Sequence, residues 1–150
     1  TMPDTRWARC DIKTVMLLPA VLAKEAAREE GAQEAWFVDE QGFITEGASS
    51  NAWIVRGDRI LTRACDSEIL RGVTRTTTFD VIRAQGWEVV EQPFTRDEVA
   101  TASEAFITSA TTIVTPVVRV DGRPVGDGKP GPVALALRHA FHDLAERTVI

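Results

Sequence analysis

The sequence has few lysines and no cluster of basic residues, and this excludes one class of partner. Only three of its 17 basic residues are lysine, the arginines are scattered along the chain, and the formal net charge is −5. Binding to a nucleic acid or to an anionic membrane surface needs a concentrated basic patch. We therefore expect neither as a partner.

Cysteine, histidine and long apolar runs are also scarce. Cys10 and Cys65 lack a C-x-x-C spacing, and unpaired thiols of this kind fit a reducing, cytoplasmic setting. No apolar run approaches the roughly 20 residues that span a bilayer. His139 and His142 stand three positions apart without a nearby cysteine, whereas zinc needs three or four ligands. We predict that both histidines lie on a helix surface and that the chain has no metal site.

The residues that are present predict one mixed α/β domain. With 150 residues, 44% hydrophobic and 26% charged, the chain has an ordinary globular balance. Helical spacing predicts a helix over 17–30 that ends at Gly31. Glycine-containing breaks between β-branched and aromatic residues predict two hairpins, with turns at 40–42 and 56–58. The other expected elements are a helix over 74–85, a strand over 87–94, a short helix over 96–102, two strands over 104–125 broken at Pro116 and Asp121-Gly122, and a helix from Gly131 to Arg147. Hairpins mixed with helices favour this class over a regular doubly wound sheet.

Lys13 lies in a strand-like run, residues 10–15, just before the apolar helix. A lysine amine becomes a useful nucleophile where loss of water favours its neutral form, and the end of a strand beside an apolar helix offers such a place. The same residue also fits an edge strand that keeps its ammonium group in water. Its position alone leaves both interpretations open.

Three further stretches carry small polar residues after a strand or before a helix. Glu46 lies in "TEGASSN", and Gly72 in "ILRGVTRTTT" precedes a helix whose first turn is rich in hydroxyls. Such a helix start offers unpaired N–H groups and the positive end of the helix dipole to a phosphate, and glycine permits a close approach. "FITSATT" ends a strand in a hydroxyl-rich turn. Taken singly, these also fit a solvated loop, a cap by Thr74 and a plain turn.

In this order along the chain, four stretches resemble the C-terminal portion of the class IV, or fold type IV, pyridoxal-phosphate-dependent aminotransferases, and D-amino-acid aminotransferases in particular. They are "CDIKTVMLLPAVLAKEAA", "EAWFVDEQGFITEGASSNAWIV", "ILRGVTR" and "FITSATTIVTPVVRVDG". The likeness runs from about Arg6 to Phe141. It implies the cofactor-binding domain of the D-amino-acid aminotransferase-like fold, in which hairpins and helices form a pseudo-barrel.

The resemblance implies pyridoxal 5'-phosphate as the cofactor and assigns roles to three side chains around its ring. Lys13 would form the internal aldimine and then move the proton between the substrate α-carbon and the cofactor carbon. Glu46 would pair with the pyridine nitrogen and favour its protonated form, the electron sink of the reaction. Leu70 would pack on the ring face.

The phosphate sites are also implied by the resemblance. Gly72, Val73 and Thr74 match the family's cradle, where backbone N–H groups and the threonine hydroxyl bind the cofactor phosphate. The turn Ser109-Ala110-Thr111 matches a second loop on the phosphate side. The family often has threonine where Ala110 stands, so we expect that hydroxyl contact either to be missing or to be supplied by Ser109 or Thr111.

Family members run to about twice this length, and their N-terminal domain supplies an arginine to the phosphate and much of the substrate-carboxylate site. We therefore expect residues 1–150 to be the C-terminal domain of a longer enzyme, completed by its N-terminal domain and paired in a homodimer. The isolated domain is expected to bind the cofactor weakly and to turn over little.

The implied activity is transamination of amino acids with 2-oxo acids, with D-amino acids such as D-alanine favoured as donors. A branched-chain L-amino-acid aminotransferase, an aminodeoxychorismate lyase and an (R)-selective amine transaminase are the alternatives within the family. A non-catalytic dimerisation or binding module that retains the fold is the alternative from another class.

Two remaining pairs of residues receive structural interpretations. Arg6 and Arg9 precede the lysine segment, and we favour surface positions for both over an ion pair from Arg6 to Glu46. Trp36 and Trp53, on the two predicted hairpins, are expected in the core.

Overall fold

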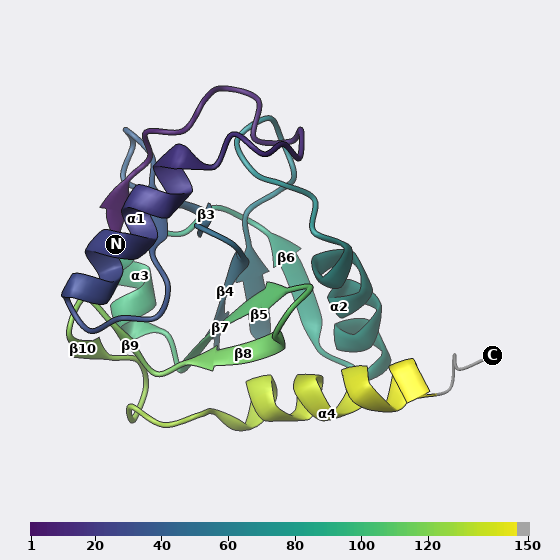
Figure 1. Cartoon of the computed structure of the whole chain (residues 1–150). Coiled ribbons are helices and arrows are strands. Elements are labelled where there is room, and N and C mark those ends of the chain that lie inside the picture. The colour runs from purple at the N-terminus through teal and green to yellow at the C-terminus, as the bar shows by residue number, and fades with distance from the viewer. Residues whose placement is uncertain (147–150) are drawn as a thin grey trace.

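The structure, a computed structural model, describes residues 1–146 and is centred on a five-stranded sheet in the order β6-β5-β4-β7-β8 (Figure 1). The central strand β4 (Asn51–Arg56) pairs antiparallel with β5 (Arg59–Thr62) and with β7 (Glu104–Ser109). Strand β6 (Glu88–Glu91) pairs parallel with β5, and β8 (Ile113–Val117) forms the other edge, antiparallel to β7.

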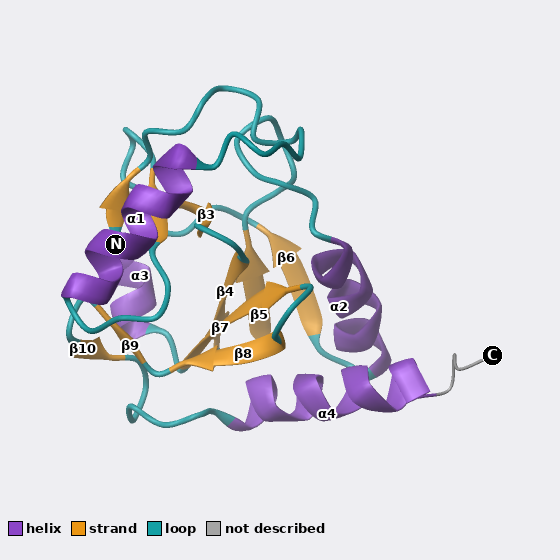
Figure 2. Ribbon diagram, viewed as in Figure 1, coloured by secondary structure: helices purple, strands orange, loops and turns teal. Residues whose placement is uncertain are grey.

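Both faces of β4 are buried because alternate side chains enter two separate cores. Trp53 and Val55 pack toward α2 (Val73–Ala84) and α4 (Pro132–Glu146), and Trp53 stacks on Phe106 with 5.5 Å between the ring centroids. The opposite face of the strand joins a core shared with α3 (Arg96–Thr101). Helices therefore cover the central sheet from both sides (Figure 2).

A smaller sheet lies against the central one. Its strands are β1 (Met2–Pro3), β2 (Trp36–Val38) and β3 (Ile44–Gly47), and α1 (Leu18–Glu29) covers it through Ala23, which packs with Phe37. A third, two-stranded sheet pairs β9 (Arg119–Val120) with β10 (Arg123–Pro124). None of these sheets closes into a barrel, so the pseudo-barrel expected from the resemblance is open in the described residues.

Most of the predicted elements are confirmed. Both hairpins, the helix that follows them and the short helix α3 occur within a few residues of their predicted bounds. Gly31 follows α1 with φ +74°, the left-handed conformation expected just after a helix. Trp36 and Trp53 are buried, and His139 and His142 are exposed on α4. The predicted helix end at Arg147 lies outside the described residues.

Two predictions about the strands are wrong. Residues 10–15 form no strand, because no neighbouring strand reaches them: Val15 is 95% exposed, and Lys13 lies in an exposed connection between β1 and α1. Pro116 does not break a strand but lies inside β8. This strand is at the edge of the sheet, where a residue without an N–H group is tolerated. The chain turns earlier, at 110–112, before Ile113 with φ 62°.

None of the described helices has the length and apolar character needed to cross a bilayer.

Candidate active site

The candidate residues gather where several strands begin or end at one edge of the central sheet. Asn51 opens β4 and pairs with Thr108 near the end of β7. Strand β3 ends at Gly47, four positions before Asn51, and β5 leads into the connection of residues 63–72 that precedes α2. Chain segments distant in the sequence therefore meet around the first residue of β4.

Glu46 is the buried centre of this group, with 6% of its surface exposed. Asn51 Nδ2 donates to its Oε2 at 3.0 Å, and the N–H of Leu70 lies 3.2 and 3.1 Å from Oε1 and Oε2. The same Asn51 nitrogen donates to the carbonyl of Leu70 at 2.9 Å. One side-chain amide thus fixes both the carboxylate and the backbone of Leu70.

Arg6 completes the environment of Glu46, contrary to the surface position favoured from the sequence. Its Nη1 donates to Glu46 Oε1, and its side chain is 11% exposed. Arg9 is exposed as predicted and pairs only with Asp11 among the described residues. The contact of Arg6 joins residues 40 positions apart in the sequence, and spacing arguments do not reach that far.

Burial and neighbouring charges shift the pKa values of Glu46 and Arg6. Burial raises the pKa of Glu46 to about 7, although the charge of Arg6 and the hydrogen bonds from Arg6 and Leu70 act in the opposite direction. Burial also disfavours the charge of Arg6, but hydrogen bonding to Asp4 and the charges of Glu46 and Asp4 leave the pKa of its guanidinium raised. A positive group brought against Glu46 would favour its carboxylate form.

The start of α2 lies directly beside Asn51. Gly72 is the N-cap residue and provides no side-chain cap, and a Cβ placed on it would lie 2.4 Å from Asn51 Oδ1. The N–H groups of Val73, Thr74 and Arg75 find no acceptor among the described residues. The helix start therefore has unpaired donors beside the Glu46 cluster, a favourable arrangement for an anion.

Arg75 places a buried cation beneath this helix start. Its guanidinium lies over the rings of Phe79 and Trp53, at 4.7 and 5.7 Å from the ring centroids. Its Nη2 donates to the carbonyl of Arg63 and to Glu91, while its Nε is buried without a partner. The side chain holds the first turn of α2 against the sheet.

The turn of residues 109–111 lies at the same edge, next to the pair of Asn51 and Thr108. The hydroxyl of Ser109 accepts from the N–H of Thr112 at 3.2 Å and bonds with the hydroxyls of Thr111 and Thr112. Ala110 and Thr111 are exposed. The turn therefore presents hydroxyls that bond with one another.

Lys13 lies outside the hydrogen-bonded network around Glu46. Its amine has no hydrogen-bond or ion-pair partner among residues 1–146. The N–H of Asp11 donates to the carbonyl of Ser67 at 3.4 Å, so the segment before Lys13 touches the 63–72 connection that carries Leu70. Both segments lie at the same end of the molecule (Figure 1).

Sequence reasoning missed Asn51 and Asp4. Asn51 was visible only as a polar residue before a buried strand, which also fits an ordinary strand start. Asp4 had no signal, because its partners Arg6 and Thr45 come together only through folding.

Comparison with known proteins identifies the family. Residues 1–120 match the family model described as amino-transferase class IV. The chain belongs to this family. It is 38% identical over 143 residues to a D-alanine aminotransferase of Bacillus licheniformis, covering 95% of this chain and 50% of that protein. It is 40% identical over 141 residues to a D-alanine aminotransferase of Listeria innocua, covering 94% of this chain and 48% of that protein.

Solved structures of this family share the fold. A T.th. branched-chain amino acid aminotransferase, complexed with N-(5'-phosphopyridoxyl)-L-glutamate, superposes with a TM-score of 0.87 at 35% identity, covering 95% of this chain and 50% of that chain. The branched-chain enzyme of Escherichia coli gives a TM-score of 0.81 at 32% identity, covering 95% of this chain and 51% of that chain. The chain thus spans about half the length of the class IV relatives that it matches.

Proposed function

We propose that this chain is the C-terminal, cofactor-binding part of a longer pyridoxal-phosphate-dependent aminotransferase that moves amino groups from amino acids, D-alanine among them, to 2-oxo acids. The observation that carries the proposal is the buried Glu46 carboxylate beside the glycine-capped start of α2. The relatives named D-alanine aminotransferase support the donor.

The residues of this cluster fit the two charged ends of pyridoxal phosphate. Glu46 would face the ring nitrogen, and the free N–H groups of Val73 and Thr74, with the Thr74 hydroxyl, would hold the phosphate. The backbone N–H and carbonyl of Leu70 are fixed by Glu46 and Asn51, and its side chain would pack on the ring. The hydroxyls of the turn at 109–111 would face the phosphate from the neighbouring strand.

When bound, the cofactor supplies a carbonyl carbon and an electron-withdrawing ring. Lys13 would provide the amine that holds the cofactor through this carbon, and its Nζ would afterwards hold and move a proton. Glu46 would place negative charge where the ring nitrogen gains a proton. Thr74 and the helix start would anchor the phosphate and so fix the ring relative to Lys13.

A surface around Lys13 supports the proposal that further protein covers this region. Large apolar side chains of the segment 12–22 are 43–95% exposed. An exposed apolar patch of this kind marks an interaction surface, and its cover would keep water from the Lys13 amine. We propose the N-terminal domain of the same enzyme, within a homodimer, as the cover. The exposed apolar residues of the segment are Ile12, Val15, Met16, Leu17, Leu18, Val21 and Leu22.

The experiment uses the full-length protein and two matched lysine variants. We expect Lys13→Ala to abolish the release of pyruvate when D-alanine is added to the cofactor-loaded enzyme. Lys24→Ala should preserve this release, because among the described residues the Lys24 amine donates its hydrogen bond to the exposed Ser49. An active Lys13→Ala enzyme would contradict the proposed function.

The donor is a separate question, and a branched-chain L-amino-acid aminotransferase is the second candidate. The structural likeness to branched-chain enzymes favours it, with 35% identity to one of them. Reaction of the loaded enzyme with L-valine but not with D-alanine would select this candidate.

A further inference from the structure

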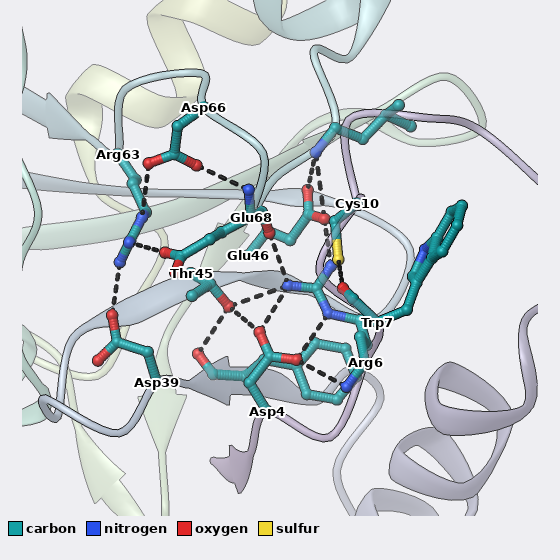
Figure 3. Close-up of polar contacts among 12 residues, drawn as sticks. Asp4, Arg6, Trp7, Cys10, Asp39, Thr45, Glu46, Arg63, Asp66 and Glu68 are labelled. Atoms are coloured by element: carbon teal, nitrogen blue, oxygen red, sulfur yellow. Dashed lines mark hydrogen bonds and ion pairs between the residues drawn. The ribbon is translucent and has the colours of Figure 1, made fainter.

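Arg6 joins several parts of the candidate site, and no sequence motif indicates these contacts. Its Nη2 donates to Asp4 Oδ2 at 2.7 Å, to the hydroxyl of Thr45 at 3.2 Å and to the carbonyl of Glu68 at 3.0 Å. Its Nε donates to Asp4 Oδ1 at 2.9 Å, and its Nη1 binds Glu46. All three guanidinium nitrogens are therefore engaged (Figure 3).

The Arg6 guanidinium is also fixed from its flat face. It lies over the ring of Phe37, with its central carbon 4.6 Å from the ring centroid. Phe37 is fully buried on β2, so the plane of the guanidinium is set by the core of the small sheet. A planar group held by a ring and by fork-shaped hydrogen bonds has little freedom to rotate.

A second arginine extends this arrangement to the other end of the β2–β3 hairpin. Arg63 pairs with Asp39 at the hairpin turn, at 2.7 Å, and with the carboxylate of Glu68. Glu68 is therefore shared: its carbonyl accepts from Arg6 and its carboxylate from Arg63 (Figure 3). The hairpin that carries Glu46 is tied to the 63–72 connection at both ends.

We propose that Arg6 is a positioning residue of the active site, which holds the Glu46 carboxylate in place and offsets the cost of its charge in a buried position. This rests on the proposed function, because it concerns the same Glu46. A carboxyl group without Arg6 would keep only the Leu70 N–H and the Asn51 amide, which are neutral donors. It would then carry its proton at neutral pH and would no longer supply the negative charge for the ring nitrogen.

The other ionisable groups around Glu46 do not replace Arg6. Asp4 is an acid whose pKa stays below its usual range, since the Arg6 hydrogen bond and charge outweigh its burial. Burial raises the pKa of the thiols of Cys10 and Cys65, so they stay neutral near pH 7. Among the described residues, Arg6 is thus the positive group in direct contact with the Glu46 carboxylate.

The test compares Arg6→Met with Arg9→Met in the full-length protein. Glutamate carboxyl titration by carbon NMR in the cofactor-free protein should show the pKa of Glu46 raised by about 1 unit or more in Arg6→Met. The dissociation constant of pyridoxal phosphate should rise roughly tenfold or more. Arg9→Met should change neither, because the exposed Arg9 pairs with Asp11 alone in the part of the chain that the structure describes. Arg6→Lys, which restores the charge but not the fork, should recover part of both effects.

A double substitution separates positioning from general loss of structure. If Arg6 acts through Glu46, then Arg6→Met should add little to the loss of cofactor affinity already caused by Glu46→Gln. The proposal would be overturned if Arg6→Met caused the same loss of cofactor affinity in the Glu46→Gln protein as in the unsubstituted protein. An unchanged pKa of Glu46 in Arg6→Met would also overturn it. If Arg6→Met does not fold, the cofactor affinity and the pKa of Glu46 are measured in Arg6→Lys instead, and the same outcomes support or overturn the proposal. An active Lys13→Ala enzyme would instead remove the proposed function, and with it the role of Arg6, whatever the Glu46 titration shows.

Discussion

At the scale of single residues, Glu46 and Arg6 illustrate what the sequence can and cannot indicate. Glu46 could be chosen because it belongs to a recognisable local stretch, "TEGASSN", and the same holds for Gly72 in "ILRGVTR". Arg6 and Asp4 could not, because their contacts with Glu46 and Thr45 span about 40 positions and arise only when β3 packs beside the chain start.

The buried Glu46 carboxyl predicts a specific pH dependence of stability. Its pKa is raised from 4.5 to about 7, so between these pH values the unfolded chain loses a proton that the folded chain keeps. The contribution of Glu46 to the free energy of unfolding should therefore fall by roughly 2–3 kcal/mol as pH rises from about 4.5 to 7, and then level off. Glu46→Gln should lack this fall.

Denaturant unfolding of both proteins without cofactor, at several pH values, measures this difference. If the difference in free energy of unfolding between the two proteins stays constant across this pH range, Glu46 is not held protonated by burial.

At the scale of elements, periodicity predicted most of the helices and strands correctly. The exceptions depend on which strands lie beside a segment in the folded chain. The run at 10–15 has strand-like residues but no partner strand, so it stays an exposed connection. Pro116 fits within β8 only because that strand is at the edge of the sheet. The start of α2 was predicted correctly, but its fit against Asn51 depends on the sheet.

The close approach of Gly72 to Asn51 can be tested by adding one methyl group. A Cβ at this position would meet Asn51 Oδ1 at 2.4 Å, so Gly72→Ala should displace the amide that holds Glu46 and Leu70. We expect the affinity for pyridoxal phosphate to fall at least tenfold by equilibrium titration. Asp80→Ala, at an exposed position of the same helix, is the control. Equal affinities of the two variants would contradict this prediction.

Helix α4 depends on a buried acid from the central sheet. Glu104 on β7 accepts from the N–H groups of Val133 and Ala134, both at 2.9 Å, in the first turn of the helix. Glu104→Ala should lower the free energy of unfolding by about 1–3 kcal/mol, since one buried and one part-buried N–H group lose their acceptor. The exposed Glu88→Ala should change it by less than about 0.5 kcal/mol. Similar denaturation midpoints for both would argue against this capping role.

At the scale of the whole molecule, the chain spans about half the length of its relatives, and the large apolar side chains of segment 12–22 are exposed. This exposure is why we propose that further protein packs there. The resemblance led us to expect an N-terminal domain, but the exposure of Lys13 appeared only in the structure. Periodicity could not show it, because exposure depends on which chain segments are present to cover a residue.

We predict that residues 1–150 bind the cofactor far more weakly than the full-length protein does. The N-terminal part would cover Lys13 and add phosphate contacts, so we expect at least a hundredfold difference in dissociation constant, roughly 3 kcal/mol. Fluorescence titration of both proteins with pyridoxal phosphate measures it. Equal affinity, or robust transamination by residues 1–150, would refute the proposed division of the enzyme.

We expect the cofactor to become attached to Lys13. Borohydride reduction of the cofactor-loaded full-length protein, followed by peptide mapping, tests it most directly. We predict a phosphopyridoxyl group on Lys13 and none on Lys24 or Lys129. An unlabelled Lys13 at saturating cofactor would contradict the account and would leave the chain a non-catalytic member of its family.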